Sequence, residues 1–423
     1  MLTTFAAMLI AMLLAAFWTT VFFIGKRRRR IPKLKLDLDS LPSLDDGLAT
    51  LAGLTGAPVH CSNSATLFQN GALFDAMQSD IAAAQHTVHL ESFVWTAGVL
   101  ERRFVDLLIA RAAAGVQVRM TIDAVGAGGA DPKQLQRLRD SGVELSMYNP
   151  IAWWNLRRLN HRTHRKLLIV DGHIGYAFGH GISDQWLGEG QDKTHWRDTG
   201  VRVEGAVVQA LQSVFMQNWI EETRRVPSGE GCFPALRETG TIAAHVVSSD
   251  AGEAVSSVSL LYTLAIASAR REVIIQNPYF VPGRGVVELL TKMVERGVAV
   301  HLMVPGKHTD SRFVRRAGTH LYEGLMRAGV RLYEFEPTLI HQKVVIVDGI
   351  WSHIGSTNFD ARSLALNEEV GLGLLDAGLA AQLKAAFDQD LLRSREMTPE
   401  LWKKRGWFRT VFAWFAYQLH EQL

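Results

Sequence analysis

The chain has 423 residues, of which 48% are hydrophobic and 21% are charged, so it is long enough for two or three domains and too apolar to be disordered. Its two cysteines, Cys61 and Cys232, form no C-x-x-C pair, which argues against a disulfide framework or a cysteine zinc site. The formal net charge of the chain is +3. Seven lysines and arginines between Lys26 and Lys35 contribute +7, so the rest of the chain carries 3 − 7 = −4. Proteins that bind nucleic acid more often spread basic charge over a binding face, so nucleic acid is not an expected partner.

The first predicted element is the uncharged, apolar stretch over residues 2–24. It is long enough to cross a hydrocarbon core of about 30 Å as a helix. Basic residues follow it, whereas in a cleaved signal peptide they precede the apolar run. We therefore expect a transmembrane helix over residues 1–25, a basic juxtamembrane linker over 26–56 that attracts anionic headgroups, and a cytoplasmic remainder. The alternative is a signal peptide.

Two stretches of the remaining chain repeat the same order of helical and strand patterns. In residues 57–235, strands are predicted over 87–95, 115–123 and 142–150, and helices over 75–84, 102–114 and 132–141. In residues 236–395, strands follow over 272–280, 297–305 and 329–337, and helices over 255–269, 285–296 and 313–328. Such an internal duplication predicts two similar α/β domains related by a pseudo-two-fold axis.

In each repeat these elements are followed by the same motif, H-x-K, four apolar residues and D, in His164 to Asp171 and His341 to Asp348. The apolar run predicts a buried strand, on which a His and a Lys two residues apart share one face. Histidine is a nucleophile or proton carrier near neutral pH, and lysine supplies positive charge for an anion. One such motif is usually a surface feature, but two with the same spacing predict a joint phosphate pocket with Lys166 and Lys343 beside the histidines. Asp171 and Asp348 complete the two motifs and are grouped with the catalytic residues, but they end the strands and are expected to brace structure and not to react.

The second motif is followed by Gly-Ser356-Thr-Asn358, whose hydroxyl and amide are expected to bind the substrate phosphate. The first half has Phe178-Gly-His-Gly181 in the matching place, without an equivalent Asn. This difference leaves the phosphate contacts of the first half open.

Two acidic residues are candidates for holding the histidines. Asp198 could accept a hydrogen bond from the second ring nitrogen of a histidine, or form a surface salt bridge with Arg197. Glu368 is the candidate for orienting His341, with an ordinary charged residue at a strand edge as the alternative.

Two further segments suggest contact with lipid. A loop before the first motif is expected to be a lip that meets headgroups, or else a solvated loop; it contains Trp153, Trp154, Arg157, Arg158, His161 and Arg162. Residues 396–423 place Trp407, Val411, Trp414 and Phe415 at helical spacing beside basic residues. This pattern is typical of an amphipathic tail lying in the membrane interface, and the alternative is a helix packed on the protein itself.

These residues resemble the phospholipase D superfamily, whose mark is the duplicated H-x-K-x4-D motif, and within it the bacterial cardiolipin synthases. The resemblance covers residues 57–395. It is carried by both motifs, by Trp196 to Asp198 and, in the second half, by Asn277 to Pro282, Val304 to Gly306 with Thr309 and Asp310, Gly355 to Asp360, Arg362 with Ser363, and Asn367 with Glu368. It implies a two-domain α/β fold, no metal or other cofactor, and a phosphohistidine intermediate.

The implied reaction joins two phosphatidylglycerol molecules into cardiolipin and releases glycerol, at the cytoplasmic face of a bacterial inner membrane. One histidine, His164 by analogy with the family, attacks phosphorus, and His341 moves the proton. Lys166, Lys343 and Asn358 stabilise the transition-state charge. The alternatives are a phospholipase D that uses water or another alcohol, a membrane-tethered nuclease, and a non-catalytic membrane scaffold. The sequence predicts no oligomeric state.

Overall fold

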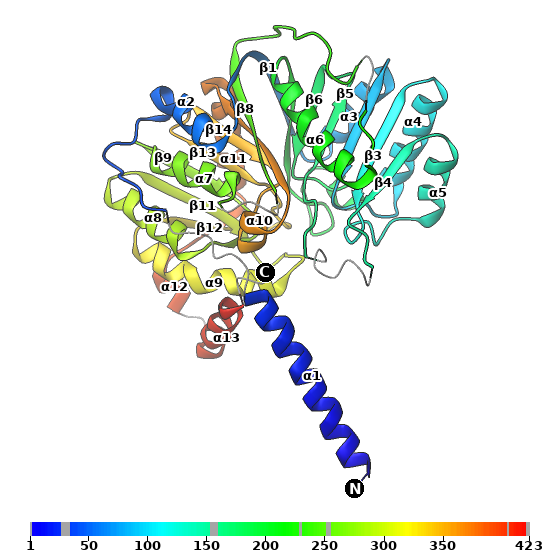
Figure 1. Ribbon diagram of the computed structural model, residues 1–423. Helices are drawn as coiled ribbons and strands as arrows, with labels where there is room; N and C mark the ends of the chain where they lie inside the picture. Colours follow the sequence, from blue (N-terminus) through cyan, green and yellow to red (C-terminus); the bar gives the residue numbers. More distant parts are fainter. Residues whose placement is uncertain are drawn as a thin grey trace.

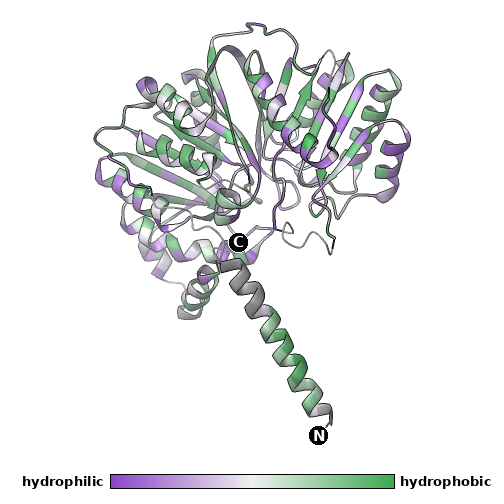
Figure 2. Cartoon of the chain, viewed as in Figure 1, coloured by the Kyte–Doolittle hydropathy of each residue, from purple (hydrophilic) through white to green (hydrophobic). Residues whose placement is uncertain are grey.

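The computed structural model describes residues 2–26, 34–152, 160–227, 231–250, 255–403 and 406–419. Helix α1 (Leu2–Lys26) points away from the body formed by the other elements (Figure 1). Its side chains from residue 4 to residue 18 are exposed, and most of them are apolar (Figure 2). Within the described ranges, no helix meets the length and hydropathy needed to span a membrane. The transmembrane helix over residues 1–25 therefore stays a prediction.

The described residues of the first half form seven strands and the helices between them. The strands are β1 (His60–Gln69), β2 (Thr87–Ser92), β3 (Gln117–Asp123), β4 (Glu144–Tyr148), β5 (Leu167–Val170), β6 (Ile174–Phe178) and β7 (Thr199–Glu204). The helices are α3 (Ala72–Ala83), α4 (Val99–Ala113), α5 (Pro132–Asp140) and α6 (Val207–Thr223), with a short 3-10 turn over Asp184–Trp186. Helix α2 (Leu44–Thr55) precedes them and packs on α7 of the second half.

The second half repeats this plan and adds elements at its end. Its strands are β8 (Ile242–Ser249), β9 (Glu272–Gln276), β10 (Phe280–Val281), β11 (Ala299–Pro305), β12 (Arg331–Phe335), β13 (Val344–Val347), β14 (Trp351–Gly355), β15 (Phe359–Asp360), β16 (Glu369–Leu375) and β17 (Ser394–Met397). Its helices are α7 (Ser257–Ala267), α8 (Arg284–Glu295), α9 (Arg312–Arg327), α10 (Ala361–Ala365), α11 (Ala377–Leu391), α12 (Pro399–Lys403) and α13 (Trp407–Gln418).

The two halves have the same strand order and meet in one sheet. The order is β4-β3-β2-β5-β6-β7-β1 in the first half and β12-β11-β9-β13-β14-β16-β8 in the second, with β17 added outside β12. Strands β1 and β8 pair antiparallel and join the halves into a 15-stranded sheet. This shared order is what a duplication predicts. The domain boundaries at residues 235 and 395 stay predictions, and β17 runs across the second of them.

A common hydrophobic core fixes the halves to each other. Leu211 and Phe215 of α6 belong to the same buried cluster as Leu383 and Phe387 of α11. Burying each such side chain stabilises the folded state by about 1.5–3 kcal/mol. The two motifs therefore meet across a packed interface.

The C-terminal helix α13 has one packed face and one exposed face. Ala416 and Tyr417 are buried in a cluster with Ala317 of α9. Trp414 and Phe415 are 52% and 55% exposed. One face of α13 is therefore packed on the protein, as the second alternative for this tail states. The other face is exposed, and its contact with a membrane stays a prediction.

Candidate active site

The two motifs lie side by side at the junction of the halves. Strand β5 begins at Leu167 and β13 at Val344, directly after Lys166 and Lys343. The apolar run forms the predicted strand, but each H-x-K lies just before that strand and not on it. His164 and His341 are only 9% and 7% exposed.

Each histidine is held by a carboxylate from the other half of the chain. The Nδ1 atom of His164 lies 3.0 Å from Oε1 of Glu369, and Nδ1 of His341 lies 2.8 Å from Oδ2 of Asp198. Both carboxylates are completely buried. Asp198 thus lies where a residue that holds a histidine was expected. The prediction that Glu368 orients His341 is wrong, because Asp198 occupies that position.

Glu368 contributes through its backbone. The amide of His164 donates to the carbonyl of Glu368 over 2.8 Å, and the amide of His341 donates to the carbonyl of Arg197 over 2.7 Å. Each histidine is therefore fixed to the residue that precedes its own carboxylate. The side chain of Glu368 points elsewhere and accepts a hydrogen bond from Tyr148.

The sequence contains a signal for Glu369 that the motif search missed. Trp196-Arg-Asp198-Thr-Gly200 and Asn367-Glu-Glu369-Val-Gly371 align on their glycines, which places Asp198 opposite Glu369. Asp198 directly precedes β7, which begins at Thr199, and Glu369 is the first residue of β16. An alignment of the halves predicts this pair, whereas the resemblance drew attention to Asn367 and Glu368.

The electrostatics of the site favour neutral imidazoles beside ionised carboxylates. Burial lowers the pKa of both His164 and His341 to about 4. Burial raises the pKa of Asp198, but the imidazoles of His180 and His341 outweigh burial and hold this pKa below its usual value. The pKa of Glu369 is also lowered, because the interaction with His164 outweighs burial. A neutral imidazole that donates Nδ1–H to a carboxylate leaves Nε2 free to attack or to accept a proton.

The two lysines lie beside the histidines of their own motifs. Lys166 Nζ donates to the carbonyl of His164 over 2.8 Å, and Lys343 Nζ lies 2.7 Å from the carbonyl and 3.0 Å from Nε2 of His341. Burial lowers the pKa of Lys166 to about 7 and that of Lys343 to about 8. A bound phosphate anion would raise both values and hold the lysines charged.

Asp171 and Asp348 lie at the far ends of the motif strands. Asp171 accepts hydrogen bonds from the backbone amides of residues 85, 86 and 87, and Asp348 from those of residues 270, 271 and 272. Both have a positive φ, 51° and 54°. The structure therefore places these two aspartates in matching turns away from the histidines. These contacts agree with the bracing role that the sequence predicts for both aspartates.

The surroundings of the two histidines differ. The hydroxyl of Ser356 donates to Glu369 on the His164 side. Asn358 is 4% exposed, and its Oδ1 has no hydrogen-bond partner among the described residues, so this amide is available to a ligand. The indole N–H of Trp186 donates to Asp198 over 2.9 Å on the other side.

The Phe178–Gly181 segment offers no amide in the corresponding place. Phe178 is buried in the core, and Nε2 of His180 lies 3.0 Å from the carbonyl of Asn70. A Cβ at Gly181 would lie 2.6 Å from Cβ of Val94, so this turn is too tightly packed for a side chain.

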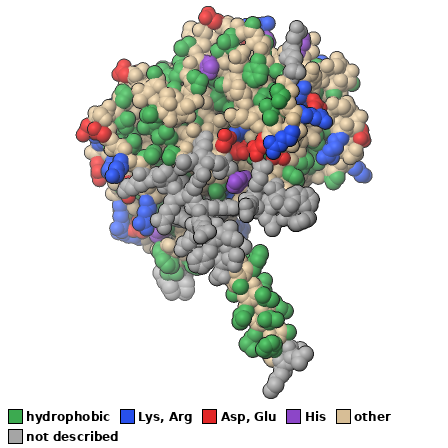
Figure 3. Space-filling model, viewed as in Figure 1, with side chains coloured by type: hydrophobic (Ala, Val, Ile, Leu, Met, Phe, Trp, Pro, Cys, Tyr) green, Lys and Arg blue, Asp and Glu red, His purple; other side chains and the backbone are tan. Residues whose placement is uncertain are grey.

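Most of the predicted lip lies outside the described residues, including Trp153, Trp154, Arg157 and Arg158. Arg162 is buried, 3.5 Å from Asp123, and so does not contact lipid. The face in Figure 3 carries Lys and Arg side chains mixed with Asp and Glu. In the described part of the chain, no three His, Cys, Asp or Glu side chains are arranged to hold a metal ion.

Comparisons relate this chain to known proteins. The sequence model of one family, described as "Cardiolipin synthase, PLD-like domain", matches residues 77–219 and 262–391. Cardiolipin synthase A of Pseudomonas putida F1 is 35% identical over 355 residues, which are 84% of this chain and 74% of the relative. The enzyme of that name from Pseudomonas aeruginosa LESB58 is 35% identical over 356 residues, 84% and 72% of the two chains.

Two solved structures share the fold. Phosphatidylserine synthase of Haemophilus influenzae has a TM-score of 0.64 at 12% identity, covering 88% of this chain and 98% of that one. Polyphosphate kinase of Porphyromonas gingivalis has a TM-score of 0.54 at 13% identity, covering 92% and 56%.

Proposed function

Because this chain belongs to the cardiolipin synthase family of phospholipase D-like phosphatidyltransferases, we propose that it joins two phosphatidylglycerol molecules into cardiolipin and releases glycerol. The observation that carries this proposal is the pair of buried histidines, each fixed by a buried carboxylate of the opposite half. Lys166 and Lys343 lie beside them and supply positive charge for a phosphodiester, which supports the proposal. A non-catalytic scaffold would not require this arrangement.

The proposed reaction has two displacement steps. Nε2 of His164 attacks phosphorus, the phosphorus–oxygen bond to glycerol breaks, and His341 gives its proton to the glycerol oxygen. The hydroxyl of the second phosphatidylglycerol then attacks phosphorus, its proton passes to His341, and the phosphorus–nitrogen bond breaks. His341 must enter protonated, and the negative charge of the bound phosphodiester favours that form. Lys166, Lys343 and the amide of Asn358 stabilise the charge on the phosphoryl oxygens.

We propose that the enzyme works at a bacterial inner membrane, with the catalytic body in the cytoplasm. The exposed apolar side chains of α1 support its insertion into lipid as a single-pass anchor. The exposed face of α13, with Trp414 and Phe415, supports a second contact in the interface. This contact would hold α9, on which α13 packs, near the headgroups.

The test uses the full chain with phosphatidylglycerol as the sole lipid and mass spectrometry of the products. Cardiolipin and glycerol in equal amounts are the expected products. Phosphatidic acid and glycerol without cardiolipin would show that water is the acceptor, and the enzyme would then be a phospholipase D.

A further inference from the structure

Tyr279 and Asp310 form a hydrogen-bonded pair that the reaction steps above do not use. The hydroxyl of Tyr279 donates to Oδ2 of Asp310. Tyr279 is half-buried and Asp310 is exposed. Burial, which is the largest effect, and the carboxylate of Asp310 both raise the pKa of Tyr279 well above its usual value, so the phenol keeps its proton. The Tyr279–Asp310 pair therefore offers carboxylate and phenol oxygens as hydrogen-bond acceptors.

The strand order places this pair at the end of the sheet where the second motif enters. Strand β13 starts directly after Lys343 and pairs antiparallel with β9, and Tyr279 comes three residues after the end of β9. Strand β11 runs parallel to β9 on its other side, and Asp310 lies in the loop between β11 and α9. The ends of β9 and β11 and the start of β13 therefore bring Lys343, Tyr279 and Asp310 to the same end of the sheet.

The short strands β10 and β15 place Tyr279 beside Asn358. They pair in parallel with Phe280 opposite Phe359, so the residues that precede these two, Tyr279 and Asn358, are neighbours as well. The side chain of Asn277 fixes this arrangement, because its Oδ1 accepts from the backbone amides of Tyr279 and Phe359, each over 3.2 Å. Tyr279 is thus held next to the amide that we assign to the phosphoryl group.

The charge of Asp310 acts on the second motif. Burial, the largest effect, lowers the pKa of His341 to about 4 and that of Lys343 to about 8, and Asp310 acts on both in the raising direction. After burial, the strongest effects on the pKa of His164 come from Glu369 and the two lysines. The Tyr279–Asp310 pair therefore belongs to the His341 side of the site.

Both steps of the proposed reaction put a glycerol group on this side. The entering and leaving groups at phosphorus are roughly in line, so glycerol leaves opposite His164 and the next hydroxyl enters from the same direction. A carboxylate can accept about four hydrogen bonds, of which Tyr279 uses one, so Asp310 can accept from glycerol hydroxyls. The positive charge of Lys343 disfavours an ammonium group at this place.

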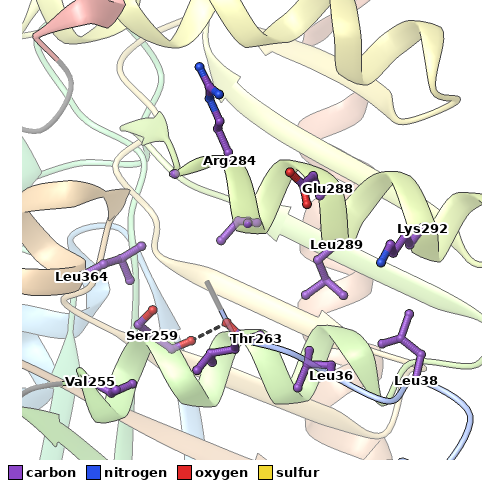
Figure 4. A pocket seen from close by; sticks show the side chains of 14 residues that line it. Leu36, Leu38, Val255, Ser259, Thr263, Arg284, Glu288, Leu289, Lys292 and Leu364 are labelled. Carbon is purple, nitrogen blue, oxygen red and sulfur yellow. Dashed lines mark hydrogen bonds between the residues drawn. The ribbon is translucent and has the colours of Figure 1, made fainter. Parts of the chain in front are cut away.

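We propose that Tyr279 and Asp310 form the subsite for the glycerol headgroup, both of the glycerol that leaves and of the phosphatidylglycerol that accepts. The hydroxyl on the middle carbon is free in both molecules and donates a hydrogen bond to Asp310. The inference rests on the proposed reaction and names the residues that select its alcohol. The cavity of about 440 Å³ between α7, α8 and α10 is a different place, because neither residue lines it (Figure 4).

The test is a competition between alcohols for the phosphatidyl-enzyme. The full-length protein receives phosphatidylglycerol as donor, together with isotope-labelled glycerol and n-propanol at equal concentration. Mass spectrometry gives the ratio of labelled phosphatidylglycerol to phosphatidylpropanol. Only folded enzyme forms either product, so this ratio does not depend on how much of the protein is folded. The wild type should favour glycerol.

Two variants of the pair should lose this preference. Asp310→Asn should lower the ratio about tenfold, because a hydrogen bond to a charged acceptor becomes a weaker one to a neutral amide. Tyr279→Phe should lower it about threefold, because the phenol oxygen is lost. Glu288→Gln is the matched control. It replaces an exposed carboxylate of α8 that lines the cavity in Figure 4, and it should leave the ratio unchanged.

A wild-type ratio in Asp310→Asn would overturn the inference. Ethanolamine replaces n-propanol in a second series, and a preference of the wild type for ethanolamine over glycerol would also overturn it, because the site would then select an ammonium group. Cardiolipin is measured in the same samples. Selective transfer to glycerol without cardiolipin refutes the proposed reaction and leaves the subsite standing, whereas cardiolipin with unchanged ratios in the variants refutes only the subsite.

Discussion

His164 and Glu369 come from opposite halves of the chain, and their Nδ1 and Oε1 atoms lie 3.0 Å apart. His341 and Asp198 form the reciprocal pair. Neither half therefore contains a complete acid-base unit, and the active site exists only because the β1–β8 junction and the shared core hold the halves together.

Replacing Asp198 by Asn should lower kcat by about 100-fold or more with little change in KM. The amide keeps the shape but removes the charge that stabilises protonated His341 in the transition state. Steady-state kinetics with phosphatidylglycerol measure this effect. Asp192→Asn changes an exposed aspartate in the preceding loop and should leave kcat unaltered. A wild-type kcat in Asp198→Asn would show that the pair does not support catalysis.

Asp348→Ala should destabilise the fold without entering the chemistry. Three backbone amides lose their hydrogen bonds to a charged carboxylate. Each such bond contributes about 1.5–3 kcal/mol to the free energy of unfolding, and water at the mutated site replaces part of this contribution. Denaturant unfolding should show a loss of about 3 kcal/mol or more, while turnover per folded molecule stays near that of the wild type. Asp388→Ala, which removes an exposed i,i+4 ion pair with Lys384, is the control. A folded Asp348→Ala protein without activity contradicts the bracing role.

Stability should fall as the pH is lowered from about 6.5 toward 4. Burial lowers the pKa of His245 to about 4 and that of His353 to about 3. In this window the unfolded chain binds protons that the folded chain excludes, so the free energy of unfolding decreases with decreasing pH, by up to about 3 kcal/mol per histidine. His353→Asn should flatten the pH profile, and the exposed His86→Asn should not. Equal slopes in all three proteins would contradict this assignment.

The double change Trp414→Ser and Phe415→Ser should weaken binding to vesicles that contain anionic lipid. Both side chains are exposed on α13, so the melting temperature should stay near that of the wild type. Vesicle flotation of protein lacking residues 1–30 measures the effect without the contribution of α1. Undiminished flotation would show that α13 is only a packed helix.

The repeat explains how much of this arrangement the sequence predicts. The motif strands, the phosphate pocket and the matching halves follow from spacing and hydrophobic pattern, which are local properties. Asp198 is also a candidate from the sequence, but Glu369 does not follow from a local pattern. It lies 205 residues from His164, and the choice between Glu368 and Glu369 depends on which one starts β16. The bracing role of Asp171 and Asp348 follows from their place at the ends of the motif strands. The backbone amides that they bind could not be named from the sequence, because those amides lie 76 to 86 residues away along the chain.

The most direct test of the two-histidine account is to trap the covalent intermediate. Phosphatidylglycerol labelled in its phosphate is mixed with excess wild-type protein and quenched in alkali within the first turnover, because phosphohistidine survives in alkali. The account predicts a labelled protein whose phosphorus maps to His164, and no label in His164→Ala. Label on His341 of the wild type would reverse the two roles. Steady cardiolipin synthesis by folded His164→Ala protein would contradict the account.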